Sequence, residues 1–139
     1  MRRLLSNLRR GRMQKTLAAT VALSAPPLGF EVYLEHYKAS FGDRWMWTPI
    51  VLTPPLTAAG IAAIFSERAA KTLLPAVSAL YAADGLVGVI THLQGVQKKP
   101  GGLRNATYNL VMGPPLLAPG SLFMIGVMGM LAPFMERED

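Results

Sequence analysis

The sequence predicts an all-α integral membrane protein, in which four transmembrane helices form two tandemly repeated helical hairpins. Three observations support this fold class. Hydrophobic residues make up 51% of the 139 positions, and the mean hydropathy is +0.30. Charged residues are only 16% of the chain and gather in short runs between apolar stretches. Similar sequence phrases also recur in the two halves of the chain, which indicates an internal duplication.

Four apolar stretches are candidates for crossing the membrane. Each approaches the roughly 20 residues that a helix needs to cross about 30 Å of hydrocarbon. In lipid every backbone polar group needs an internal partner, so these stretches are expected to be helical. The four stretches are residues 16–37, 48–65, 72–93 and 108–135.

These stretches divide the chain into three parts. A basic N-terminal segment covers residues 1–15 and an acidic tail covers 136–139. Between them lies one four-helix membrane domain, residues 16–135, built from the hairpins 16–65 and 72–135.

The distribution of cations predicts how the chain is oriented. Of the fourteen Lys and Arg residues, nine fall on the N-terminal segment, the loop between the hairpins and the tail. The positive-inside rule therefore places both termini in the cytoplasm of a bacterial cell, with a multi-pass protein in the inner membrane. A cleaved signal peptide is the competing interpretation of the first stretch. It would put Pro26 directly after a cut at Ala25, and no Ala-x-Ala sequence precedes that point.

Several function classes are excluded by what the sequence lacks. The chain has no cysteine, which rules out disulfides, thiolate nucleophiles and iron–sulfur clusters. Nucleic acid is not an expected partner, because the positive charges are divided between both membrane faces and no nucleic-acid motif is present. Since no soluble catalytic constellation is found either, we expect a non-catalytic subunit rather than a complete enzyme.

The two histidines occupy matching positions in the duplication. His36 follows Gly29, and His92 follows Gly85, by seven residues each. A Pro-Pro-Leu phrase then comes after each histidine, at residues 51–60 and 111–120, and predicts a kink in the second and fourth helices. A duplication that carries one imidazole per copy indicates a site shared between the copies.

The histidines favour a haem b site. The first and third helices run in the same direction, so both imidazoles share one membrane face and one depth, and haem iron accepts axial histidine. Glycines on the same helix face would leave room for a flat ligand, although small residues also let membrane helices pack closely. Nearby cations would face the haem carboxylates, with lipid headgroup contact as the alternative. The predicted cofactor-binding residues are His36, His92, Gly29, Gly85, Gly88, Arg44, Lys98 and Arg104.

Carboxylates within the spans give a competing interpretation. Glu31, Glu35 and Asp84 lie in predicted helices, where ionisable groups are costly and usually functional. Together with His36 and His92 they could hold a divalent metal, although the Glu-x-x-His spacing of di-iron bundles is missing. Asp84 could instead carry protons or hydrogen-bond a neighbouring helix.

The leading functional hypothesis is a small cytochrome b-like membrane subunit of a respiratory or photosynthetic electron-transfer complex. Its expected partners are other membrane subunits, the lipid bilayer and quinone. One alternative is a cofactor-free membrane anchor or scaffold that stabilises a larger complex. Another is a proton- or metal-handling transport component.

Overall fold

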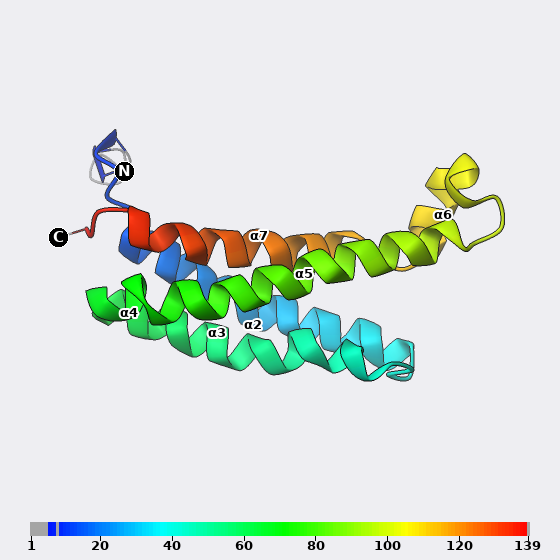
Figure 1. The fold of residues 1–139 in the computed structure, drawn as a ribbon, viewed down its shortest axis with the longest axis horizontal. Coiled ribbons are helices and arrows are strands. Elements are labelled where there is room, and N and C mark those ends of the chain that lie inside the picture. The colour runs from blue at the N-terminus through cyan, green and yellow to red at the C-terminus, as the bar shows by residue number, and fades with distance from the viewer. Residues whose placement is uncertain (1–5, 8, 139) are drawn as a thin grey trace.

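The protein is a helical bundle with four long helices (Figure 1). The structure, a computed structural model, describes residues 6, 7 and 9–138. Among these residues, four segments are long and apolar enough to cross a membrane, which confirms the predicted all-helical class with four candidate spans. The α-helices described in full are α2 (Gln14–Lys38), α3 (Thr48–Phe65), α4 (Glu67–Lys71), α5 (Leu73–Gln97), α6 (Ala106–Met112) and α7 (Leu117–Leu131), and the 3-10 turns are η1 (Arg44–Trp47), η2 (Gly102–Asn105) and η3 (Ala132–Phe134).

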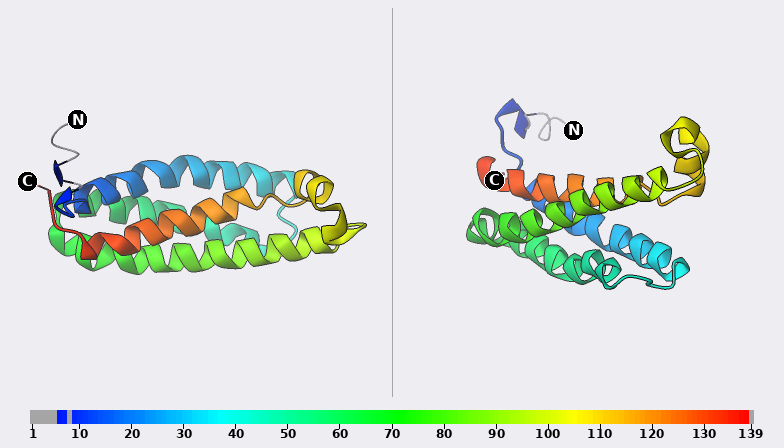
Figure 2. Two further views of the ribbon diagram at one scale, coloured as in Figure 1. Left: turned by 90° about the horizontal axis from the view of Figure 1, so that it is seen from above. Right: turned by 45° about the vertical axis from the view of Figure 1, so that its right-hand side comes forward.

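The long helices pack as two antiparallel pairs. Helix α2 lies against α3, and α5 lies against α7. The pairs meet where α3 faces α5 and α2 faces α7, so α2 and α5 lie diagonally across the bundle and run in the same direction (Figures 1 and 2). The first and last residues described therefore lie at one end, and both histidines lie toward the other.

Small residues let the paired helices approach closely. A Cβ atom added to Gly60 of α3 would lie 3.0 Å from the backbone nitrogen of Ala22 in α2. One added to Gly126 of α7 would lie 2.6 Å from the nitrogen of Ala82 in α5. Backbone-to-backbone packing of this kind supplies the van der Waals contact that holds helices together in lipid.

The proline pairs behave differently in the two halves of the chain. Pro54 and Pro55 lie inside the continuous helix α3, whereas the second phrase ends α6 at Met112 and starts α7 at Leu117. The fourth stretch, 108–135, was predicted as one kinked helix, and this is wrong because the break at 113–116 divides it. The residues before the two proline pairs differ, and so does their backbone conformation.

Thr53 precedes Pro54, and its Oγ1 donates to the carbonyl of Pro49, one turn earlier, at 2.7 Å. Gly113 precedes Pro114 and has extended backbone, which is the conformation that a following proline favours. Glycine offers no side chain to bridge the preceding turn. The two copies therefore take different structures, and the repeated-hairpin arrangement is not confirmed.

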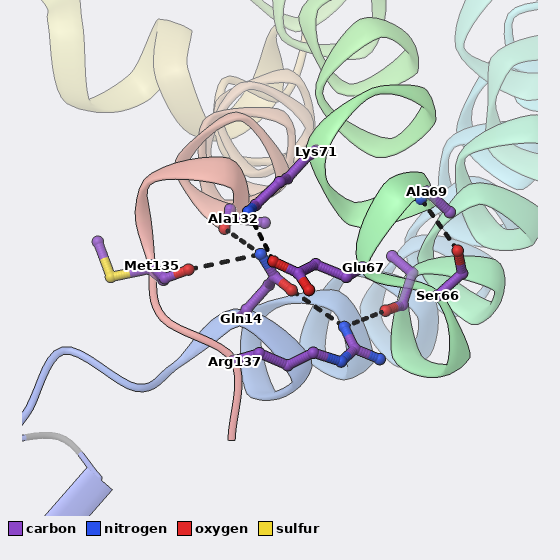
Figure 3. Close-up of polar contacts among 9 residues, drawn as sticks. Gln14, Ser66, Glu67, Ala69, Lys71, Ala132, Met135 and Arg137 are labelled. Atoms are coloured by element: carbon purple, nitrogen blue, oxygen red, sulfur yellow. Dashed lines mark hydrogen bonds and ion pairs between the residues drawn. The ribbon is translucent and has the colours of Figure 1, made fainter. Parts of the chain in front are cut away.

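A polar clasp, formed by Gln14, Arg137 and Glu138, joins the helix ends near the termini. Figure 3 shows Gln14 and Arg137 with their partners. Arg137 Nη1 donates to Gln14 Oε1 at 3.0 Å and to the Ala63 carbonyl at 3.1 Å, and Nη2 donates to the Ile64 carbonyl at 2.6 Å. Gln14 Nε2 in turn donates to the carbonyls of Ala132 and Met135. The acidic tail predicted at 136–139 is thus, as far as Glu138, part of the packed structure.

Glu138 caps the start of α2. Its carboxylate accepts from the backbone N–H groups of Lys15 at 2.6 Å and Thr16 at 2.8 Å, and from Thr16 Oγ1 at 2.7 Å. The N-cap residue, Met13, which precedes α2, provides no side-chain cap of its own. An anion at this position also complements the helix dipole. The Glu138 carboxylate therefore accepts the hydrogen bonds that the side chain of an N-cap residue usually accepts.

The Glu138 cap makes stability depend on pH. Burial raises the pKa of the Glu138 carboxyl, but hydrogen bonds from the Thr16 hydroxyl and from the Lys15 and Thr16 N–H groups outweigh burial and leave the pKa below its usual range. A folded-state pKa that is lowered gives stability that is complete above the ordinary glutamate pKa of about 4.3 and is lost as the pH falls below it.

We expect thermal unfolding of the detergent-solubilised protein to shift to lower temperature between about pH 5.5 and pH 3.5. A Glu138→Gln variant, which has no charge to lose, is less stable at pH 7 and shows a smaller shift. Parallel curves for the two proteins over this range would contradict a cap that depends on the Glu138 charge.

Candidate functional site

Both histidines are held by backbone carbonyl oxygens. His36 Nδ1 donates to the carbonyl of Met46 at 2.6 Å, and His92 Nδ1 donates to the carbonyl of Pro115 at 2.6 Å. A carbonyl can only accept, so the ring proton is on Nδ1 in each case. The lone pair is then on Nε2, which is the nitrogen that a metal-ligating histidine presents when its other nitrogen is hydrogen-bonded to the protein.

The turn between α2 and α3 places the Met46 carbonyl. Ser40 and Phe41 have positive φ angles, of 56° and 45°, which turn the chain sharply after α2. The Phe41 ring then stacks on Trp47 with a centroid distance of 4.1 Å. Asp43 Oδ1 accepts from the backbone N–H of Trp45 at 3.0 Å and so starts η1, on which Met46 lies. An aromatic stack and a capped 3-10 turn thus position the partner of His36.

The Pro115 carbonyl is available to His92 because of another proline. In a helix this oxygen would accept from the backbone N–H four residues later, but that residue is Pro119, which has none. The break between α6 and α7 therefore leaves an acceptor that the imidazole satisfies. This pairing also gives a structural role to His92 that needs no ligand.

The two imidazoles lie at the same end of the bundle. They come from the diagonal, parallel helices α2 and α5, and His36 is within electrostatic range of both His92 and Asp84. Both residues are half-buried. The tight core does not reach them: the buried residues of α2 end at Val32, and those of α5 at Gly85 except for Val96. The two hairpins also diverge toward this end (Figures 1 and 2).

The predicted glycines face neighbouring helices. A Cβ atom on Gly29 would lie 2.5 Å from Thr53 Oγ1, and one on Gly88 would lie 2.8 Å from Pro119 Cβ. A Cβ atom on Gly85 would lie 2.8 Å from the Pro119 carbonyl oxygen. The space beside these glycines is therefore occupied by α3 and α7, and close helix packing accounts for all three.

The predicted cations are exposed at the histidine end. Arg44 lies over the ring of Trp45, with its guanidinium carbon 5.5 Å from the ring centroid. Lys98 is the C-cap residue that follows α5, and Arg104 lies on η2, further along the chain. None of the three has a described hydrogen bond to either histidine.

The three carboxylates of the metal hypothesis lie apart from one another. Glu31 is exposed, and Glu35 pairs with Lys38. Asp84 is half-buried and accepts from Thr48 Oγ1 at 2.5 Å, across the interface between α3 and α5. Within residues 6, 7 and 9–138, no three His, Asp or Glu side chains gather closely enough to hold a metal ion.

Sequence reasoning missed the partners of these polar residues. Thr48 holds Asp84, and the buried Thr53 lies 3.3 Å from the hydroxyl of Tyr81, which is fully buried. Since Thr53 gives its one proton to Pro49, Tyr81 is the donor in this pair. In the sequence, these contacts are signalled only by polar residues within otherwise apolar helices. Such residues indicate which face of a helix points inward, but they do not identify the residue that is contacted.

The comparisons with known proteins do not identify a family. No protein-family model matches the chain, and neither curated proteins nor solved structures gave a significant match.

Proposed function

We propose that the protein is a small membrane subunit that holds haem b between His36 and His92 and transfers electrons within a larger complex. One observation carries the proposal: both imidazoles donate Nδ1–H to a backbone carbonyl and so keep a lone pair on Nε2, the nitrogen that could bind a haem iron. Two histidines on parallel, diagonal helices at one end of a bundle are a suitable arrangement for two axial ligands.

The chain's own residues would orient and isolate the cofactor. Haem supplies the one-electron redox chemistry when it is bound, and its axial ligands influence the potential. The carbonyls of Met46 and Pro115 fix the ring orientations and increase the basicity of Nε2. Near the histidines, α2 and α5 contribute few buried side chains. Nearer the termini, buried side chains of these two helices fill the space between the hairpins.

The proposed location and partners follow from charge and size. The cation distribution supports a bacterial inner membrane with both termini in the cytoplasm. The described part outside the candidate spans consists of short connections and ends, so an electron donor or acceptor has to come from other membrane subunits or from quinone.

The test is a reduced-minus-oxidised absorption spectrum of protein purified from a host that supplies haem. We expect haem b bands in the natural protein and a haem content at least about tenfold lower in His36→Ala and in His92→Ala, since each substitution would remove one of the two residues that would hold the haem. Glu31→Gln, an exposed change on α2, is the matched control and keeps the bands. The absence of bands from the natural protein, or equal bands in both histidine variants, would contradict the proposal.

A cofactor-free anchor is the second candidate, and the glycine packing favours it. Gly29, Gly85 and Gly88 are fully explained by contacts with Thr53 and Pro119, and each histidine already satisfies a carbonyl. This function predicts a colourless protein whose assembly with other subunits survives both histidine substitutions.

A further inference from the structure

The connection between α5 and α7 carries a concentration of positive charge for which the described part of the chain shows no ion pair. This connecting segment, residues 98–112, contains Lys98, Lys99 and Arg104, all exposed. The sequence has no Asp or Glu between Asp84 and Glu136, so no carboxylate near this segment in the chain balances them. The result is a local positive charge that is exposed to an external anion.

The other connection at the same end of the bundle is balanced. Lys38 forms an ion pair with Glu35, and Arg44 lies over the Trp45 ring. Asp43 adds a second carboxylate beside them. Two connections at one end of the bundle thus differ in net charge, and this difference makes the balanced one a suitable control.

The connecting segment is ordered and presents apolar side chains. Asn109 is buried, and its Nδ2 donates to the carbonyls of Pro100 at 3.1 Å and Gly102 at 2.8 Å, which fixes α6 against the turn that precedes it. Helix α6 projects to one side beyond the bundle (Figure 1). Five large apolar side chains on the segment are exposed: Leu103, Tyr108, Leu110, Val111 and Met112.

We propose that the connecting segment is a membrane-surface element, whose basic residues bind the phosphate groups of anionic phospholipids while α6 lays its apolar side chains into the edge of the bilayer. Exposed apolar residues beside cations, on a fixed short helix at the end of a transmembrane bundle, match the chemistry of the headgroup region. The segment takes lipid phosphate rather than haem carboxylate as its anion. The inference does not depend on the proposed function.

Lipid selectivity tests the charged part. The full-length protein in detergent is mixed with equal amounts of dioleoylphosphatidylglycerol and dioleoylphosphatidylcholine, and bound lipids are counted by native mass spectrometry. We expect a preference for phosphatidylglycerol that falls roughly thirtyfold in Lys98→Gln/Lys99→Gln, since each cation near an anionic surface contributes a factor of about five in binding. Lys38→Gln/Arg44→Gln removes the same charge from the balanced connection and keeps the preference.

Depth in the bilayer tests the apolar part. Because the chain has no cysteine, a single Val111→Cys change accepts one nitroxide label. In phosphatidylglycerol-containing vesicles this label is expected to be exposed to oxygen dissolved in lipid, whereas a label at Ser40→Cys is exposed to a water-soluble relaxation agent.

A label at position 111 that faces water, as it would if the segment docked onto an acidic soluble protein, overturns the proposal. So does an unchanged lipid preference in Lys98→Gln/Lys99→Gln. The lipid experiments and the haem spectrum give independent results. A failure of the membrane-surface proposal is therefore distinguishable from a failure of the proposed haem function.

Discussion

Replacing Gly85 by alanine is expected to separate α5 from α7 and to destabilise the bundle by about 2–3 kcal/mol, because overpacking that cannot relax by side-chain rotation costs about this much. The new Cβ atom would meet backbone rather than side chain: it would lie 2.8 Å from the Pro119 carbonyl oxygen and 2.9 Å from Phe123 Cα. One helix must therefore move as a whole. The same movement would draw the Pro115 carbonyl away from His92.

Gly120 is a control within the same helix pair. A Cβ atom on this residue of α7 has nothing within 4 Å. Gly120→Ala is therefore expected to stabilise the protein, by up to about 1 kcal/mol, through helix propensity alone. The free energies of unfolding of Gly85→Ala and Gly120→Ala, measured in mixed micelles, test this expectation. A Gly85→Ala protein as stable as Gly120→Ala would show that α5 and α7 do not pack at this distance.

The pattern of apolar stretches was sufficient to predict four membrane helices, because the hydrophobic thickness of a bilayer imposes a length that is visible in the sequence. The same pattern was not sufficient to predict the break at residues 113–116, within the fourth apolar stretch. Pro54 and Pro114 begin nearly identical phrases, but only the first is preceded by a hydroxyl that bonds the turn behind it. The residue before each proline pair differs between the two copies: Thr53 lies within a continuous helix, whereas Gly113 has extended backbone.

His36 and His92 were predicted to share one end of the bundle, and in the structure they lie toward the C-terminal ends of the parallel helices α2 and α5. What holds each ring was not predictable, since neither acceptor is a side chain. The Met46 carbonyl depends on two residues with positive φ, and the Pro115 carbonyl on the absent N–H of Pro119. Backbone acceptors leave little trace in a sequence, so the roles of these residues emerge only from the fold.

Replacing Arg137 by alanine is the second change with a large expected effect. The guanidinium donates to the carbonyls of Ala63 and Ile64, in the last turn of α3, where carbonyls have no partner within the helix. It also donates to Gln14 Oε1 at the start of α2. Hydrogen bonds from a charged donor contribute about 1.5–3 kcal/mol each, and water reaching this half-buried side chain replaces part of the loss.

We therefore expect Arg137→Ala to lower the free energy of unfolding by about 3 kcal/mol in total. Arg137→Lys is expected to be intermediate, because one ammonium group cannot reproduce the two-pronged geometry of a guanidinium. Arg68→Ala removes the same charge from an exposed position on α4, and its effect should stay within about 0.5 kcal/mol. The free energy of unfolding of the three variants, measured in the same detergent, separates the effect of the guanidinium geometry from the effect of the charge. If Arg137→Ala and Arg68→Ala were equally stable, the tail would be a solvated charge cluster and the helix ends would be held by packing alone.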